Sequence, residues 1–314
     1  MSGKLELGQA RTEAEREAER AIAAVPLFQK GRVTYSMVGG GLSNSNWRIE
    51  VAGHRRPYFL KIPGKGSELF INRKASNQAA RLAHERGVGA EVVYFDPVSG
   101  LEVTEFMEGY RASTNVDFLD PEIWGRVTDL YREFHTCPPL MITRTIFDMV
   151  EEHIGQVREL KATLPADFAV LHEKYRAARD AFTASGLDIT ACFNDPMPGN
   201  FLLSSDNQVK LVDFEWASNN ERYYDLGVWI GEMFYSDCVV EAIARRYFKS
   251  DSRQHPARLT VMRAVADFKW ALWAMVQERI SSLDFDYHKY GVWKFMRARL
   301  YMDDRRWTNW LHLV

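Results

Sequence analysis

Hydrophobic and polar positions alternate with different periods in the two halves of the chain. Up to about residue 106, short runs of β-branched and aromatic residues are separated by turn residues, which is typical of strands. The expected strands are 33–38, 47–51, 58–62, 92–95 and 101–106, with one helix at about 73–85 that ends at Gly87. This order predicts a small antiparallel sheet with one helix packed against it.

Residues 11–24 have the pattern of a surface helix rather than a strand. Ala14, Ala18, Ala21 and Ile22 form a weakly apolar stripe at helical spacing, and Pro26 ends the segment. We assign this element, residues 1–30, no chemistry.

After Gly109 long helical patterns dominate, interrupted only by two short strand-like runs at 201–203 and 209–212. The fold class is therefore α+β, with two lobes. A small antiparallel β-sheet lobe spans 31–106, and a larger, mainly helical lobe spans 107–314. A cleft between two lobes is a favoured place for a ligand.

Composition and charge exclude several classes of protein. The 314 residues are 46% hydrophobic and 26% charged with a net charge of −2, which is typical of a globular chain without the basic surface of a nucleic-acid binder. Cys137, Cys192 and Cys238 are an odd number with no CxxC pair, which favours a reducing compartment. Since the N-terminus lacks a signal-peptide pattern and no apolar run approaches bilayer length, we expect a cytoplasmic protein with no membrane or nucleic-acid partner.

The strongest chemical signal is an aspartate and an asparagine in a Pro/Gly-containing loop, followed by a strand that ends in aspartate. Asp195 lies five residues before Asn200, and the run 209–212 delivers Asp213 at its end. Phosphoryl transfer needs oxygen ligands for a divalent metal and one carboxylate to take the acceptor's proton. A lone motif of either kind would be an ordinary polar loop, but the two together indicate a kinase with Asp195 as base and Asn200 and Asp213 as Mg²⁺ ligands.

A glycine-rich segment and a lysine supply a candidate phosphate site in the β lobe. Consecutive glycines at 39–41 let backbone N–H groups approach phosphate oxygens, although the same segment also fits a flexible hairpin. No Gly-Lys-Ser/Thr follows, so this is not a Walker A loop. Lys61 points to the opposite face of its strand from Leu60 and Ile62, where it is either solvated or directed at ATP phosphates.

These motifs together resemble the choline/ethanolamine kinase family, within the wider fold that protein kinases and aminoglycoside phosphotransferases share. The resemblance runs from Gly39 to about Tyr290. It is carried by residues 40–44 (GGLSN), 194–200 (NDPMPGN), 213–216 (DFEW), 224–227 (YDLG) with Glu232, 270–277 (WALWAMVQ) and 280–282 (ISS). The last two stretches separate this family from the general kinase fold.

The resemblance implies a two-lobed protein-kinase-like fold and a small-molecule kinase that uses Mg²⁺ and ATP. The implied acceptor is an amino alcohol, choline first and ethanolamine second, whose phosphomonoester feeds phospholipid head-group synthesis. Nucleotide contacts are expected from Gly40, Gly41, Ser43, Asn44 and Lys61, and from the backbone of Glu105 to Met107 facing adenine.

An aromatic segment near the C-terminus fits a cationic acceptor. Trp270 and Trp273 are three residues apart and share a helix face, although without the resemblance the usual explanation would be core packing. Aromatic faces attract cations, and choline recognition is a standing use of that interaction. The other residues expected to contribute to acceptor binding are Trp216, Tyr287, Tyr290, Glu215 and Glu232.

Two positions depart from the family pattern. Phe193 stands two residues before Asp195, where the family has histidine, and Ser76 stands where a glutamate usually pairs with the strand lysine. Lys61 is therefore either mispositioned or held by another carboxylate. The alternatives left open are an aminoglycoside-type phosphotransferase and a nucleotide- or amine-binding relative without turnover; the oligomeric state is not determined.

Overall fold

The structure, a computed structural model, describes residues 3–39, 44–64 and 71–314, and the chain forms two compact units. The first unit comprises Met1–Ser113 and Gly199–Trp216, and the second comprises Thr114–Pro198 and Ala217–Val314. Gly40, Gly41 and Ser43, which the sequence predicts to contact the nucleotide, lie outside the described residues.

The first unit is built on a six-stranded antiparallel sheet in the order β1-β2-β3-β4-β6-β5. The strands and the helix that the sequence predicts for this unit are confirmed to within a few residues at each end. The elements are β1 (Leu5–Glu6), α1 (Glu13–Ala24), η1 (Pro26–Phe28), β2 (Val33–Met37), β3 (Asn44–Val51), β4 (Tyr58–Pro63), α2 (Arg73–Glu85), β5 (Val92–Phe95) and β6 (Glu102–Glu105).

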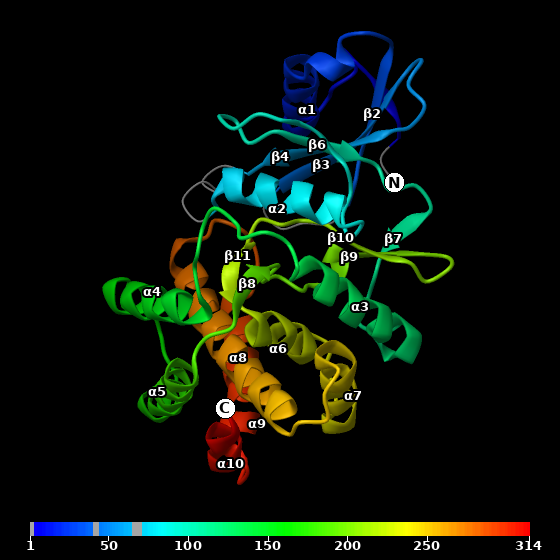
Figure 1. Cartoon of the computed structure of the whole chain (residues 1–314). Coiled ribbons are helices and arrows are strands. Elements are labelled where there is room, and N and C mark those ends of the chain that lie inside the picture. The colour runs from blue at the N-terminus through cyan, green and yellow to red at the C-terminus, as the bar shows by residue number, and fades with distance from the viewer. Residues whose placement is uncertain (1–2, 40–43, 65–70) are drawn as a thin grey trace. The chain divides into compact units, whose positions relative to one another are not determined.

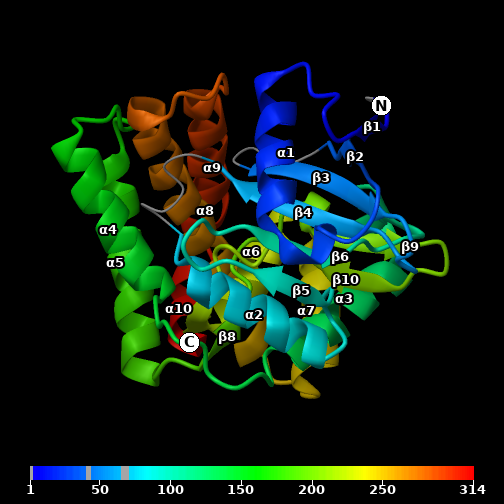
Figure 2. The ribbon, with the colours of Figure 1, turned by 90° about the horizontal axis from the view of Figure 1, so that it is seen from above.

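Helices α1 and α2 cover opposite faces of this sheet. The small residues of α1, with Ile22, pack on Trp47, Ile49 and Leu60, and Figure 2 shows α1 lying across β2, β3 and β4. Strand alternation sends Lys61 to the other face, where Asn77 of α2 donates a hydrogen bond to Glu102. The α2 face of the sheet therefore carries the unit's buried charge.

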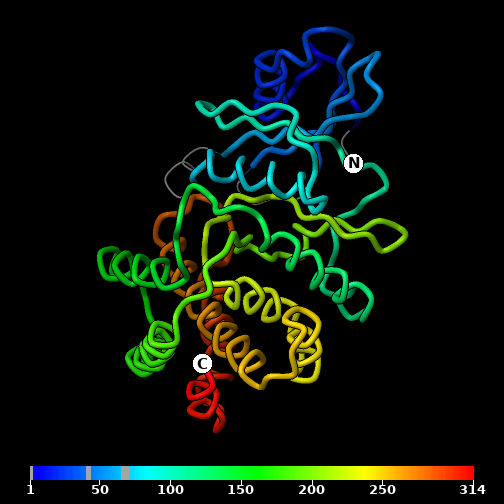
Figure 3. Tube along the Cα trace, viewed as in Figure 1, coloured from blue at the N-terminus to red at the C-terminus, as the bar shows by residue number. Residues whose placement is uncertain are grey.

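A second, three-stranded sheet, β10-β9-β7, completes the first unit. It joins β7 (Tyr110–Ala112) to the later hairpin formed by η4 (Pro198–Asn200), β9 (Phe201–Ser204) and β10 (Val209–Leu211). The path of the chain shows the hairpin beside β7 (Figure 3). Because β9 pairs with β7, and Leu211 N–H bonds to the Val88 carbonyl at 2.8 Å, residues 199–216 fold with the β-rich part, whereas the sequence pattern grouped them with the helical part.

The second unit is mainly helical, as expected. Its elements are η3 (Asp117–Leu119), α3 (Pro121–Phe134), α4 (Ile146–Glu159), α5 (Phe168–Ser185), β8 (Ile189–Cys192), β11 (Ser218–Glu221), α6 (Arg222–Glu232), α7 (Asp237–Phe248), α8 (Gln254–Ile280), α9 (Tyr287–Met302) and α10 (Trp307–Leu313). The 27-residue helix α8 is buried along most of its length among the other helices of this unit (Figure 1). A helix that is enclosed on all sides does not show the amphipathic stripe of a surface helix. Within the described residues, no helix is both long enough and apolar enough to cross a bilayer.

One buried carboxylate ties the loop after β8 to helix α6. Asp225 is fully buried and accepts hydrogen bonds from the N–H groups of Phe193 and Asn194, both at 2.7 Å. Its third partner is His135 Nε2 at 3.0 Å, and His135 Nδ1 lies 2.6 Å from the Tyr247 hydroxyl. A buried carboxylate is tolerated only when it is paired and hydrogen-bonded, and this one is.

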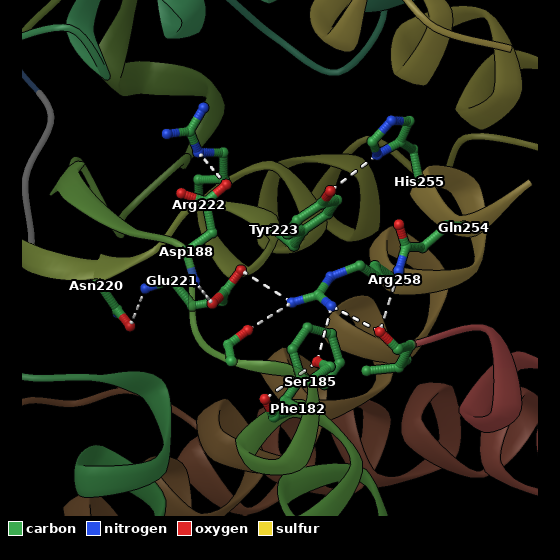
Figure 4. A network of polar contacts seen from close by, with 12 residues as sticks. Phe182, Ser185, Asp188, Asn220, Glu221, Arg222, Tyr223, Gln254, His255 and Arg258 are labelled. Carbon is green, nitrogen blue, oxygen red and sulfur yellow. Dashed lines mark hydrogen bonds and ion pairs between the residues drawn. The ribbon is translucent and has the colours of Figure 1, made fainter. Parts of the chain in front are cut away.

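A second buried network in the same unit surrounds Arg258 (Figure 4). Its guanidinium lies 3.7 Å from Glu221, donates to Ser185 Oγ at 2.9 Å and stacks over Tyr223. Burial, opposed by a hydrogen bond from the Asp188 N–H and by the charge of Arg258, raises the pKa of Glu221 from 4.5 to about 7. The folded chain therefore holds a proton on Glu221 at a pH where the unfolded chain has released it.

Replacing Asp225 with alanine is expected to destabilise the second unit by about 3–5 kcal/mol, because it leaves His135 and two buried N–H groups without their acceptor. Urea unfolding followed by tryptophan fluorescence measures the change. Asp225→Asn retains one acceptor oxygen and is expected to be intermediate. An alanine variant as stable as the wild type would show that other contacts hold the loop.

Glu221→Gln is expected to change the pH dependence of stability. The pKa of Glu221 is higher in the folded chain than in the unfolded chain, so its protonation stabilises the folded chain. This contribution to the free energy of unfolding is complete below about pH 4.5 and is lost as the pH rises through about 7, a change of up to about 3 kcal/mol. The wild type should therefore lose Tm relative to the variant between pH 5 and pH 8. Exposed Glu159→Gln is the matched control, and parallel Tm curves for wild type and Glu221→Gln would contradict the assignment.

Candidate active site

In the first unit, Lys61 lies among three carboxylates. Its Nζ is 3.2 Å from Glu215 Oε1, 3.3 Å from Asp213 Oδ1 and 4.0 Å from Glu102 Oε1. Burial lowers the pKa of Lys61, but the charges of Asp213, Glu102 and Glu215 outweigh it and raise the pKa above its ordinary value. Lys61 is therefore a permanent cation directed into the charged face of the sheet and not into bulk solvent.

The pairing of Lys61 shows what stands in for the glutamate missing at position 76. Glu102 is its direct cross-strand partner between β4 and β6, and Asn77 Nδ2 holds Glu102 at 3.0 Å. Ser76 lines the same small pocket as Lys61, Glu102 and Glu215 but carries no charge to offer. Another carboxylate thus holds the lysine, which was one of the two outcomes left open by the sequence.

Asn200 and Asp213 are brought together by the hairpin of the first unit. The N–H of Val212 donates to the Asn200 carbonyl at 3.0 Å, so the backbone at Asn200 runs beside the residue that precedes Asp213. Asp213 has φ 67°, a left-handed conformation that is uncommon outside glycine, although aspartate adopts it more often than most residues. Strand β10 ends at Leu211, just before this turn, and about a third of the Asp213 side chain is exposed.

The charges in this part of the first unit fit a divalent cation. Three carboxylates face one lysine, so negative charge is in excess, and burial together with the charge of Asp213 raises the pKa of Glu215. Carboxylate and amide oxygens are the ligands that Mg²⁺ prefers. Asp213 and Asn200 are the residues of this unit that would hold it.

The other residues of the first unit that the sequence predicts to contact the nucleotide also have defined positions. Asn44 Nδ2 donates to Glu215 Oε1 at 2.8 Å, which links the end of the glycine-rich segment to the Lys61 cluster. Glu105 is bonded through its backbone N–H to the Glu91 carbonyl and through its side chain to Arg56. In the described part of the chain, the Met107 N–H donates to no protein acceptor, so it is available to a ring nitrogen of adenine.

Asp195 belongs to the second unit, in the loop that Asp225 fixes. Asn194, with φ 68°, turns the chain just before it, and its side chain bonds to Ser218 and Asn220. Phe193 is fully buried where the family has histidine, and His135, which caps the C-terminus of helix α3, supplies the imidazole that bonds Asp225 instead. The departure at Phe193 therefore leaves the loop anchored.

His135, Cys192 and Asp225 have ligand atoms close enough together to suggest a metal, but their chemistry argues against one. Both nitrogens of His135 and both oxygens of Asp225 are already used in hydrogen bonds. Burial, with the charges of Asp225 and Glu221, raises the pKa of the Cys192 thiol well above its ordinary value, whereas a metal needs the thiolate. This cluster is a structural network.

The aromatic residues of α8 and α9 gather as the helical spacing predicts. Trp273 contacts Trp270, Tyr287 and Tyr290 edge to face, with ring centroids 5.3, 5.7 and 6.2 Å apart. We call these four residues the aromatic cluster. Burial, then the charges of Glu232 and Asp195, raise the pKa of Tyr290, so both carboxylates lie in the electrostatic surroundings of the cluster.

The carboxylates expected at the acceptor have other partners. Glu232 pairs with Lys294 and lies 3.6 Å from Arg297, and both cations also contact Asp267. Glu215 pairs with Lys61 and, like Trp216, belongs to the first unit. Acceptor binding by Glu215, Trp216 and Glu232 stays a prediction from the sequence.

Sequence reasoning missed Glu102, His135 and Lys269 as parts of these sites. Lys269 is buried in α8 beside Trp270, with its Nζ 3.2 Å from the centroid of that ring. Glu102 and His135 had no motif around them; only the register of two strands and the packing of α3 bring them to their partners.

Known proteins of similar sequence and structure identify the family of this chain. A family model described as Choline/ethanolamine kinase matches residues 35–258. Probable choline kinase 2 of Arabidopsis thaliana is 22% identical over 305 residues, covering 88% of this chain and 84% of its own, and Ethanolamine kinase of Drosophila melanogaster is 26% identical over 280 residues, covering 77% and 53%.

Among solved structures, a choline/ethanolamine kinase family protein from Mesorhizobium loti superposes with a TM-score of 0.82 at 25% identity, covering 96% of this chain and 98% of that one. The expected α+β, protein-kinase-like fold class is confirmed by this likeness. Because the family model spans well over half of the chain, this protein belongs to the choline/ethanolamine kinase family, whose members are ATP-dependent phosphotransferases that act on an alcohol.

Proposed function

We propose that this kinase transfers the γ-phosphoryl group of ATP to the hydroxyl of a small amino alcohol, with choline and ethanolamine as the candidate acceptors. The observation that carries the proposal is the aromatic cluster of the second unit, which is suited to an ammonium group and lies within the electrostatic influence of Asp195. The names of the two relatives above support both acceptors equally.

The chain's own groups account for the steps of the reaction. Lys61 would neutralise phosphate oxygens, and the Met107 N–H would bind adenine. Asp213 and Asn200 would hold Mg²⁺, which supplies charge neutralisation at the phosphates when it is bound. Asp195 would accept the proton of the acceptor hydroxyl as its oxygen bonds to phosphorus, and ADP leaves with the electron pair of the broken P–O bond.

The reducing compartment expected from the cysteines is consistent with this reaction, and we place the protein in the cytoplasm. Cys137, Cys192 and Cys238 are all free thiols. The phosphomonoester product is a precursor that phospholipid head-group synthesis would consume.

The function is tested by ADP release with Mg·ATP against choline, ethanolamine and an aminoglycoside. We expect turnover with an amino alcohol and none with the aminoglycoside. Asp195→Ala should lower kcat by about 10²–10⁴-fold, the usual contribution of a general base, while leaving ATP affinity nearly unchanged. An active Asp195→Ala enzyme would remove Asp195 from this role, and turnover only with the aminoglycoside would overturn the proposed acceptor.

The replacement of the glutamate at position 76 by Glu102 leads to a rescue experiment. Glu102→Gln should raise KM for ATP with little change in kcat, because Lys61 loses its cross-strand carboxylate. Adding Ser76→Glu to Glu102→Gln should bring KM back toward the wild-type value. Ser76→Ala is the control and should change neither constant. An unchanged KM in Glu102→Gln would show that Glu215 and Asp213 suffice to hold the lysine.

A further inference from the structure

The protein places a lysine of its own on the aromatic cluster. Lys269 is 1% exposed, and its Nζ lies 3.2 Å from the centroid of the Trp270 ring, well inside the range of a cation–π contact. Trp270 is itself 7% exposed. One face of this buried ring is thus covered by a lysine of the same helix.

The neighbours of Lys269 make this an unusual place for a positive charge. Burial lowers the pKa of Lys269 well below its ordinary value; Asp195 opposes this, while Arg144 and Lys294 add to it. Lys294 also reaches Tyr290, with its Nζ 5.3 Å from that ring. A substrate cation at the cluster therefore finds one face of Trp270 occupied by Lys269, with Lys294 beside Tyr290 and with Asp195 and Glu232 as the nearby carboxylates.

The two candidate acceptors respond differently to such a site. A quaternary ammonium has no N–H to donate, so its recognition depends on the faces of aromatic rings. A primary ammonium has three N–H donors and can bind carboxylates such as Glu232 directly. Covering one ring face removes more of the binding of a quaternary group than of a primary one.

From this geometry we infer that Lys269 is a specificity-determining residue that occupies the Trp270 face in place of a substrate cation and shifts acceptor preference from quaternary to primary ammonium alcohols. The inference rests on the proposed function and refines it. It reverses the order, choline before ethanolamine, that the sequence alone favours.

The test compares Lys269→Met with the wild type, using the ratio of kcat/KM for choline to kcat/KM for ethanolamine. Methionine keeps the length of the side chain and removes the charge. Freeing one ring face should raise the ratio by about 2- to 30-fold, the equivalent of one cation–π contact. Lys269→Gln, which also lacks the charge, should raise the ratio in the same direction and guards against a folding defect peculiar to one variant.

A neutral isostere separates recognition of charge from packing. In 3,3-dimethylbutan-1-ol a carbon replaces the nitrogen of choline, so shape is kept and charge is lost. Lys269→Met should increase kcat/KM for choline relative to this isostere, whereas a purely structural role would change both in parallel. Exposed Lys289, which lies 4.9 Å from the Trp293 ring on α9, provides the matched control, and Lys289→Met should leave both ratios unchanged.

Choline affinity measured by calorimetry in the presence of a non-hydrolysable Mg·ATP analogue separates the two possible failures. If no amino alcohol supports ADP release in any variant, the proposed function fails, and tighter choline binding by Lys269→Met still supports the inference about Lys269. If turnover is present but both ratios and the choline affinity are unchanged in Lys269→Met and Lys269→Gln, the inference is overturned while the proposed function stands.

Discussion

The Asp225 carboxylate fixes the loop that carries Asp195, and the chemistry of the second unit depends on that loop. Two backbone N–H groups and one imidazole converge on this fully buried group. Bonds to backbone set the path of the chain whatever the side chains at those positions are. This explains why phenylalanine is tolerated at position 193, since the loop is anchored through its N–H and not through its ring.

In the first unit, the carboxylates around Lys61 carry more negative charge than the lysine neutralises. One lysine faces three carboxylates on the buried side of the sheet, a cluster that leaves negative charge for a metal ion to neutralise. Glu102 takes the place of a helix glutamate because its strand lies next to that of Lys61, with the two residues directly paired. Lys61 therefore keeps a carboxylate partner, but a strand supplies it here in place of a helix.

The second unit combines aromatic faces with a mixture of charges. Glu232 and Asp267 are shared with Lys294 and Arg297, and burial raises the pKa of Asp267 to about 6 against the pull of those cations. Lys269 covers one face of Trp270. Under the proposed function, an ammonium group would compete with side chains of the protein for the same rings and carboxylates.

The sequence by itself determined the helices and strands and the spacing of the candidate site residues along them. The alternation around Lys61 fixed the face on which it lies, and the three-residue step from Trp270 to Trp273 put them on one side of a helix. These features depend only on the period of a strand or helix, which a few neighbouring residues encode. The five-residue step from Asp195 to Asn200 predicted one loop, but the structure places Asn200 in η4 of the first unit and Asp195 in the second unit.

Only the tertiary structure decided which distant groups meet. Glu102 beside Lys61, His135 against Asp225, and Glu215 joined to Asn44 are pairs separated by 41 to 171 residues, and nothing local specifies them. Lys269 is next to Trp270 in sequence, but neighbouring residues on a helix do not ordinarily face each other. Because α8 is enclosed, Lys269 is buried, and its Nζ lies over the face of the neighbouring Trp270 ring.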